Sequence, residues 1–361
     1  MSTLVSITAK PDPARIGPHW IRSLPVLVLY PHNQCNCRCV MCDIWRIREA
    51  SQITPADAAQ LLPSFKQLGV RWVVLSGGEP QLNEKWSWLA QMLRSAGSRV
   101  TLLTSGLLLK PQAKAVAENI DDVIVSLDGP PAVHDSIRRI PDAFEQMADG
   151  VRALHKIRPE MEIRARCTVQ KANHHSLRAV VAYARQIGLT SISFLAADLT
   201  SSAFNRHEGW SPHQRDRVSL NADEVEELGL EIERLITQEA AKIAPAFVVE
   251  RPEKLRRIVQ HFRSHIAKAH HTAPRCNAPW VSAVIDADGD VRPCFFHPAL
   301  GNIHRQPLAD ILNSPVALDF RSNLDIASNE TCRRCVCSLY LSRSDELSAL
   351  TEAKSSSSST A

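Results

Sequence analysis

Aromatic residues, surplus charge and long apolar runs are all scarce in this chain of 361 residues. Aromatics make up 5% of it, too few for platforms that stack nucleic-acid bases. Its 42 basic and 38 acidic residues leave a formal charge of +4, which gives no reason to expect nucleic acid or a membrane as a partner. No apolar run approaches the ~20 residues that span a bilayer, and the start lacks the pattern of a signal peptide. We therefore expect a cytoplasmic protein.

Cysteine, in contrast, is abundant and clustered. Four of the ten cysteines lie within residues 35–42, five lie within 276–337, and Cys167 stands alone. In a reducing cytosol such clusters indicate metal or redox sites more often than disulfides. Two groups at opposite ends of the chain predict two separate metal sites.

Short apolar runs alternate with helical patterns between Leu24 and Asp198. This alternation predicts an α/β fold with a parallel sheet, and six units are too few for a closed eight-stranded barrel. Polar and glycine-containing motifs follow three of the strands, where such sheets bind ligands. The expected strands are residues 24–30, 70–77, 99–106, 121–129, 161–170 and 190–198, and the expected helices are 54–69, 83–97, 110–120, 143–157 and 174–188.

The pattern changes after Asp198. Residues 199–217 are polar and irregular, which suggests a lid or linker, and two helices follow. In the second helix we expect an apolar stripe, with Arg257 and Lys268 on a solvated face or, alternatively, on a patch for an anionic substrate. A hairpin is predicted at 281–294. The expected stripe residues are Leu255, Ile258, Val259, Phe262 and Ile266.

These shifts divide the chain into five parts. The expected divisions are an N-terminal extension (1–23), a core (24–200), a polar connecting segment with helices (201–271), a cysteine-rich α+β domain (272–341) and a disordered tail (342–361).

The first cysteine cluster, "CNCRCVMC", contains Cys35, Cys39 and Cys42 in the spacing C-x3-C-x2-C. Three thiolates on one loop suit a [4Fe–4S] cluster with one iron left free for a small molecule. The alternative is a zinc site that uses all four cysteines, although zinc motifs normally add a distant second pair. The extra residue, Cys37, is interpreted as a small loop residue without a ligand role.

Further motifs occur in order along the chain: "SGGEP" at 76–80, "TSG" at 104–106, "SLDGPPAVHDSIRR" at 126–139 and "TVQKANHHSL" from Thr168. With the three cysteines, they resemble the radical S-adenosylmethionine (SAM) superfamily, whose members use SAM and a [4Fe–4S] cluster to generate a 5′-deoxyadenosyl radical. The resemblance implies a partial (β/α)6 barrel. The SAM-contacting residues that it implies are Met41, Gly77, Gly78, Glu79, Pro80, Ser105, Ser126, Asp128 and Arg138.

The second cluster resembles the extension called SPASM or its shorter form, Twitch. The spacing from Cys276 to Cys294, followed by "CRRCVC" at 332–337, is similar to that of a Twitch-bearing dehydrogenase. The resemblance implies one auxiliary [4Fe–4S] cluster, and a structural zinc site is the alternative. The implied ligands are Cys276, Cys294, Cys332 and Cys335, with Cys337 as a possible substitute for one of the last pair.

The catalytic base is not identified by the sequence. Sulfatase-maturing relatives carry an aspartate directly after the cysteine that corresponds to Cys294, whereas Phe295 and Phe296 follow it here. Their substrate chemistry is therefore not carried over. The candidates for a replacement base are His297, Asp198, Glu208 and His207.

The resemblance implies an enzyme that takes electrons from a flavodoxin- or ferredoxin-type reductant. We expect a net oxidation of a small molecule or peptide in natural-product or cofactor biosynthesis. The alternatives are crosslinking of a ribosomal peptide, for which the ~24 residues before the first strand are too short for a leader-binding module, haem side-chain modification, a non-oxidative rearrangement, and a non-catalytic iron–sulfur or zinc scaffold.

Overall fold

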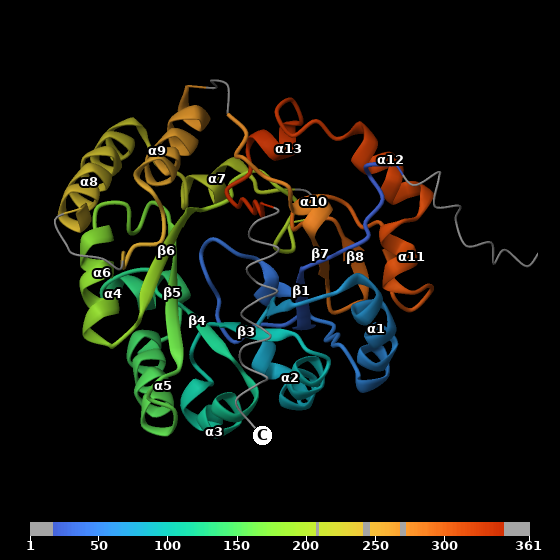
Figure 1. The fold of residues 1–361 in the computed structure, drawn as a ribbon. Coiled ribbons are helices and arrows are strands. Elements are labelled where there is room, and N and C mark those ends of the chain that lie inside the picture. Colours follow the sequence, from blue (N-terminus) through green and yellow to red (C-terminus); the bar gives the residue numbers. More distant parts are fainter. Residues whose placement is uncertain (1–16, 207–208, 241–245, 268–271, 343–361) are drawn as a thin grey trace, which may run out of the picture.

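The computed structural model describes residues 17–206, 209–240, 246–267 and 272–342. Six parallel strands form an open, curved sheet, and all six coincide with strands predicted from the sequence (Figure 1). The sheet does not close, which confirms the partial barrel. The strands are β1 (Val26–His32), β2 (Trp72–Gly77), β3 (Arg99–Thr104), β4 (Asp122–Ser126), β5 (Glu162–Val169) and β6 (Ser191–Ala196).

The C-terminal part continues this sheet. Strand β7 (Ser282–Ile285) pairs in parallel with β1, and β8 (Asp290–Arg292) and β9 (Gly301–Asn302) follow as antiparallel neighbours. The hairpin predicted at 281–294 is thereby confirmed, with Gly289 in its turn at a φ of 84°. Its addition to β1 was not predicted, and it fixes the second cysteine group beside the barrel.

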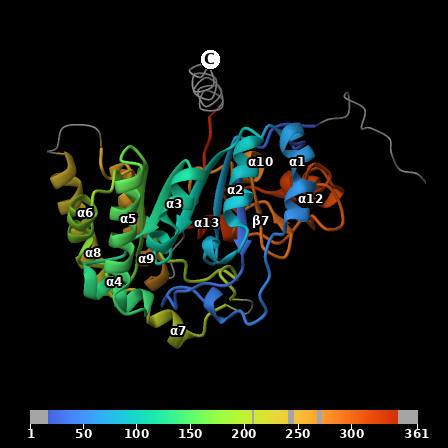
Figure 2. The same ribbon diagram turned by 90° about the horizontal axis from the view of Figure 1, so that it is seen from below.

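Helices cover the outer face of the sheet, and Figure 2 shows α2, α3 and α5 side by side in this layer. The first helix starts with a reciprocal capping box between Thr54 and Asp57 and ends at Gly69, which has a φ of 62°. The helices of the barrel are α1 (Pro55–Leu68), α2 (Trp86–Ser95), α3 (Leu109–Asn119), α4 (Pro131–Arg138), α5 (Ala143–Ile157) and α6 (Leu177–Gln186).

The later helices close the structure around the second cysteine group. In α9, Leu255, Ile258, Val259 and Phe262 are buried as predicted, whereas Ile266 is 43% exposed because the helix ends there. The later elements are α7 (Pro212–Asp216), α8 (Ala222–Ala240), α9 (Pro252–Ile266), α10 (Ala278–Val281), α11 (Leu308–Leu312), α12 (Pro315–Asn323) and α13 (Glu330–Arg333), and two 3-10 turns occupy Ile44–Arg46 and Pro80–Leu82.

The prediction of a solvated basic face on α9 was wrong for Arg257. This residue is half-buried, and its guanidinium donates to the carbonyl oxygen of Cys335 at 2.8 Å. Lys268 and nearly all of the expected tail lie outside the described residues. Helix α9 therefore supports the second cysteine group directly.

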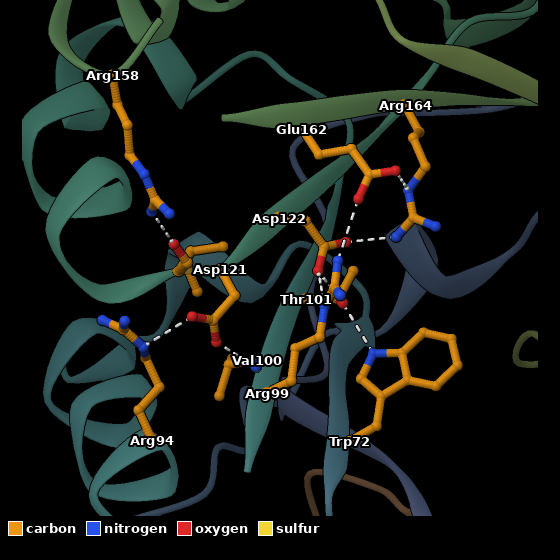
Figure 3. Close-up of polar contacts among 11 residues, drawn as sticks. Trp72, Arg94, Arg99, Val100, Thr101, Asp121, Asp122, Arg158, Glu162 and Arg164 are labelled. Carbon is orange, nitrogen blue, oxygen red and sulfur yellow. Dashed lines mark hydrogen bonds and ion pairs between the residues drawn. The ribbon is translucent and has the colours of Figure 1, made fainter. Parts of the chain in front are cut away.

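A buried ionic network joins the N-terminal ends of three strands (Figure 3). Asp122 is fully buried and accepts from Arg99 Nε at 2.7 Å and from the Thr101 hydroxyl at 2.9 Å, and it also pairs with Arg164. The Thr101 hydroxyl in turn accepts from the Trp72 indole at 2.8 Å. Paired side chains therefore occupy part of this end of the barrel, and Trp72 also lines the interior cavity.

Candidate active site

The loop that carries Cys35, Cys39 and Cys42 leaves β1 and lies against the end of α4. The amide of Arg38 donates to the Arg138 carbonyl, and that of Val40 donates to the Ile137 carbonyl, both at 3.0 Å. The structure thus brings the first cysteine motif and the end of "SLDGPPAVHDSIRR" together. These two segments are about a hundred residues apart in the sequence.

The four thiols of this loop differ in burial. Cys37 and Cys39 are buried, whereas Cys35 and Cys42 are half-buried. The pKa of Cys37 is raised to about 12, mainly by a hydrogen bond with the Cys35 thiol and to a smaller extent by burial. Burial and the neighbouring Cys39 raise the pKa of Cys42 to about 12. A bound cation would reverse these shifts, because it favours thiolates over thiols.

The donor set fits an iron–sulfur cluster better than a single ion. Across the described residues, no three His, Cys, Asp or Glu side chains already converge on one metal ion. Cluster sulfur ligands are spread more widely than the ligands of a single ion, because each bonds a different iron. The Arg138 guanidinium also donates to Cys39 Sγ at 3.5 Å, which supplies positive charge beside the thiols.

The two glycines of "SGGEP" permit a close approach of β2 to this loop. A side chain at Gly78 would place its Cβ 2.0 Å from the Gln34 carbonyl oxygen, and one at Gly77 would meet Tyr30 at 2.7 Å. Gly77 also has a φ of 101°, which L-residues with side chains rarely adopt. The backbone of this motif therefore lies directly against the residues that precede Cys35.

Glu79 turns inward from that motif and connects it to β3. Its fully buried carboxylate accepts from the Ser105 hydroxyl at 2.7 Å, from the Ser105 amide at 2.9 Å and from the Thr104 hydroxyl at 2.9 Å. Burial raises the pKa of Glu79, and these bonds oppose that rise. The Ser105 hydroxyl is also 3.1 Å from Asn36 Oδ1 in the cysteine loop. Glu79 thus organises the strand ends.

Asp128 and Arg138 form a second buried link. Their side chains are 2.5 Å apart, and Asp128 also accepts from the Thr168 amide of β5 at 2.9 Å. The Asp128 amide donates to Nδ1 of the buried His134 at 3.2 Å. Of the remaining predicted SAM contacts, Ser126 is half-buried at the end of β4, Met41 is half-buried in the cysteine loop, and Pro80 is buried directly after Glu79.

The irregular segment after β6 lies across the cysteine loop. Trp210 donates from its indole to Asp43 Oδ2 at 2.6 Å, and the Asp43 amide donates to the Phe204 carbonyl at 3.2 Å. Arg206 donates to the Met41 carbonyl at 2.9 Å, and its guanidinium packs 3.9 Å from the centre of the Trp210 ring. The segment thus covers this side of the loop, as expected for a lid.

The candidate bases occupy different surroundings. Asp198 forms a buried ion pair with Arg206 at 2.9 Å, so its carboxylate is already engaged. His297 is buried with Nε2 3.4 Å from Cys332 Sγ, and burial lowers its pKa. His207 and Glu208 lie outside the described residues. The geometry therefore places His297 beside the second cysteine group.

All five C-terminal cysteines line one cavity of about 250 Å³ on the inner side of the sheet. Burial raises the pKa of Cys294 to about 12 and that of Cys332 to about 11, and each rise is strengthened by Cys276. Burial also raises the pKa of Cys335, to which Cys337, Cys294 and Cys276 contribute. The thiols of this cavity thus raise one another's pKa values, and the ligand set remains a prediction.

Tyr30 lies between the two cysteine groups. Its ring stacks on Phe295, with 6.2 Å between the ring centres. Burial raises the pKa of the Tyr30 phenol, and Asp286 and then the thiols of Cys337 and Cys42 add to the rise. One thiol from each group thus contributes to the pKa of the same buried phenol.

Sequence reasoning missed several polar residues of the cavity wall, namely Arg166, Glu250 and Lys254. For Arg166 a signal was present, because β5 alternates between half-buried and buried residues and Arg166 takes an inward position. Glu250 lies just before α9 and Lys254 lies in it, and no local motif marks either residue.

Each of the described helices is too short or too polar to cross a membrane.

Comparisons with known proteins agree with this arrangement. Residues 29–169 match the family model described as the radical SAM superfamily, and residues 276–336 match SPASM, an iron–sulfur cluster-binding domain. An AdoMet-dependent heme synthase of Methanosarcina barkeri is 27% identical over 77% of this chain and 78% of its own length. A pre-heme d1 synthase of Dinoroseobacter shibae is 25% identical over 81% of this chain and 74% of its own length.

Peptide-related proteins are similar as well. The subtilosin biosynthesis protein AlbA of Bacillus subtilis is 25% identical over 79% of this chain and 58% of its own length. Among solved structures, anSMEcpe with bound AdoMet has a TM-score of 0.64 at 18% identity, covering 86% of each chain. Streptococcus suis SuiB bound to S-adenosylmethionine has a TM-score of 0.62 at 17% identity, covering 89% of this chain and 74% of its own. These two structures support the fold.

Proposed function

Because this chain belongs to the radical SAM superfamily and carries a C-terminal SPASM domain, we propose that it catalyses a net two-electron oxidation in cofactor or natural-product biosynthesis. The observation that carries this proposal is the pairing of β7 with β1, which holds the second cysteine group beside the strand from which the first cysteine loop leaves. A substrate bound between the two groups would have radical chemistry on one side and an electron acceptor on the other.

Cys35, Cys39 and Cys42 are the proposed ligands of the SAM-binding [4Fe–4S] cluster. With SAM bound, this group supplies a carbon radical that takes a hydrogen atom from the substrate. The chain's own residues prepare the place for it. Gly77 and Gly78 let the β2 backbone approach the loop, and Arg138 supplies positive charge beside the Cys39 thiol.

Around these ligands, Asp128 and Glu79 hold the strand ends in position. Asp128 fixes Arg138 against Cys39, and Glu79 fixes the Ser105 turn through three hydrogen bonds from Ser105 and Thr104. Arg206 and Trp210 hold the segment after β6 against the cysteine loop, and cover of this kind matters because a carbon radical is quenched readily by side reactions. The proposed contacts to SAM are Met41, Gly77, Gly78, Glu79, Pro80, Ser105, Ser126, Asp128 and Arg138.

The second cysteine group is the proposed site of an auxiliary [4Fe–4S] cluster. We assign Cys276, Cys294, Cys332 and Cys335 as its ligands, and support for this set comes from their mutual effects on thiol pKa values. Four cysteine ligands would occupy all four irons and leave none free to bind a substrate. Electron transfer is therefore the role that fits this cluster. A flavodoxin- or ferredoxin-type protein is the proposed external reductant.

The substrate class is supported by the relatives. The heme synthase of Methanosarcina barkeri and the pre-heme d1 synthase of Dinoroseobacter shibae each align with most of this chain, which favours an oxidation on a cofactor precursor. The second candidate is maturation of a ribosomal peptide, because the subtilosin biosynthesis protein also aligns with 79% of the chain. The cavity on the inner side of the sheet suits a substrate side chain in either case.

Anaerobic reconstitution of the full chain tests the proposal. The wild type is compared with a Cys35/Cys39/Cys42→Ala triple variant by iron and sulfide counting and by EPR with and without SAM. We expect about eight irons in the wild type and about four in the variant, with 5′-deoxyadenosine formed only by the wild type. Four irons plus zinc in the wild type would overturn the oxidative role, and absence of any response to SAM would overturn the enzyme assignment.

A further inference from the structure

Arg166 points into the cavity, near enough to Glu250 to oppose the rise that burial causes in the pKa of that carboxyl group. Strand β5 turns Arg164, Arg166 and Thr168 toward the inside of the sheet. Arg164 pairs with Asp122 and Glu162, whereas the one hydrogen bond found for the Arg166 side chain is 3.4 Å long, from Nε to Ser193 Oγ. Within the described residues, no carboxylate oxygen lies within 4.0 Å of the Arg166 guanidinium.

Lys254 adds a second cation at the same wall, and Glu250 is the one acidic side chain that lines the cavity. Glu250 Oε2 already accepts from the Phe194 amide at 2.8 Å, and its Oε1 is 3.6 Å from Lys254 Nζ. Arg166, Lys254, Glu250 and Cys337 all line the cavity. Two cations and one engaged carboxylate therefore share its wall with Cys337.

The rest of the inner wall is mainly apolar, so the positive charge is concentrated at one place. Strands β1 to β4 contribute chiefly aliphatic and aromatic surface, and the turn after Cys294 adds two phenylalanines. The apolar lining includes Val26, Val28, Trp72, Val74, Leu103, Ile124, Phe295 and Phe296. A guanidinium in such surroundings loses hydration and gains strongly from an anionic partner.

We propose that this cavity binds the substrate through an alkyl carboxylate held by Arg166, with Lys254 as a second positive charge. This inference rests on the proposed function and specifies its substrate class. The planar guanidinium matches the two oxygens of a carboxylate, and the apolar wall suits the alkyl chain that carries it.

The size of the cavity determines how much of the substrate enters. Sites that enclose a whole small molecule usually measure about 300–1,000 Å³, whereas this cavity measures about 250 Å³, and an auxiliary cluster on its cysteines would occupy part of that volume. It therefore takes an arm of a larger substrate. The shared chemistry is an alkyl carboxylate, and its two possible sources are the propionate arm of a tetrapyrrole and an acidic side chain of a peptide.

Equilibrium binding to the reconstituted full chain, without SAM or reductant, tests this inference. The probes are mesoporphyrin against its dimethyl ester, and a glutamate-containing hexapeptide against its glutamine counterpart. We expect the acid of one pair to bind at least about tenfold more tightly than its neutral counterpart, and the pair that shows the preference identifies the source. Equal binding within both pairs would overturn the inference.

Variants locate the effect. Arg166→Gln should remove the preference for the acid, and Arg256→Gln should retain it, because Arg256 lies outside the cavity lining and pairs with Glu233. A preference that persists in Arg166→Gln would contradict the assignment. If Arg166→Gln does not fold, Arg166→Lys takes its place and should weaken the preference, since lysine lacks the planar fork; an unchanged ratio would contradict the assignment.

The outcome is separable from that of the proposed function. Binding is measured without SAM cleavage, so equal probe binding by a wild type that still forms 5′-deoxyadenosine would overturn only the carboxylate site. A wild type that forms no 5′-deoxyadenosine would overturn the proposed function itself.

Discussion

The guanidinium of Arg138 lies 2.5 Å from the carboxylate of Asp128, and both side chains are buried. Burial lowers the pKa of Arg138, but Asp128 and the thiols of Cys39 and Cys37 outweigh this and keep the guanidinium charged. Since Asp128 also accepts from the Thr168 amide, one ion pair joins the ends of β4, α4 and β5 to the cysteine loop.

Replacing Arg138 should therefore affect both stability and cluster binding. We expect Arg138→Gln to lower the free energy of unfolding by about 3–5 kcal/mol, because it leaves a buried, uncompensated carboxylate. It should also reduce the iron bound by the first cysteine group. Urea unfolding and iron counting measure the two effects.

The matched control for this change is Arg46→Gln. Arg46 pairs with Asp43 at 2.8 Å, but its side chain is 52% exposed, and exposed pairs contribute about 0–1 kcal/mol. Equal effects of the two substitutions on stability would show that burial of the Asp128–Arg138 pair is unimportant.

Cys37 should prove dispensable for cluster binding, although its thiol contacts those of Cys35 and Cys39. We expect Cys37→Ala to retain the full iron content at a stability cost of about 1 kcal/mol, the typical effect of a single substitution. Cys35→Ala, two positions away, should instead lose about four irons. Iron counting and EPR compare the two variants, and iron loss in Cys37→Ala equal to that in Cys35→Ala would make Cys37 a ligand.

The six barrel strands could be predicted because each is a short apolar run bounded by turn residues. The cap at Thr54 and the stop at Gly69 were equally visible, since both depend on local backbone chemistry. Helix α4 was not predicted as a separate element, because its eight residues lie within the motif "SLDGPPAVHDSIRR", which was interpreted as a ligand-binding turn. Local signals therefore recovered most of the elements.

The long-range parts could not be predicted from local pattern. The pairing of β7 with β1 joins residues more than 250 positions apart, and nothing in "SAVI" specifies that neighbour. Likewise, Arg257 carries the signal of a surface residue, yet the fold places the Cys335 carbonyl beside it. The wall formed by Arg166, Glu250 and Lys254 arises from the same kind of tertiary contact.

The buried pair of Asp198 and Arg206 should hold the lid. We expect Arg206→Met to destabilise the protein by about 3–5 kcal/mol, since Asp198 would be left as an unpaired buried charge. The double variant Asp198→Asn/Arg206→Met should recover part of this loss. Urea unfolding of the wild type, Asp198→Asn, Arg206→Met and the double variant measures the coupling. Additive losses of stability would show that the pair does not act as a unit.

His134 should make stability depend on pH near neutrality. The pKa of His134 is lowered well below its usual value, mainly by burial and to a smaller extent by the nearby charge of Arg138. In the unfolded chain, His134 titrates near about 6.5. The unfolded chain therefore binds a proton that the folded protein excludes. Stability from this source is complete above the unfolded pKa and is lost as the pH falls below it, by at most about 1.4 kcal/mol per pH unit.

The variant His134→Asn isolates this contribution, because the asparagine Oδ1 can replace Nδ1 as acceptor for the Asp128 amide. Urea unfolding between pH 7.5 and about 5 should give a steeper loss of stability for the wild type than for His134→Asn, even if the variant is less stable at pH 7.5. The other histidines titrate in both proteins and cancel in the comparison. Parallel curves would mean that His134 accepts a proton in the folded state, with its imidazolium stabilised against both burial and Arg138.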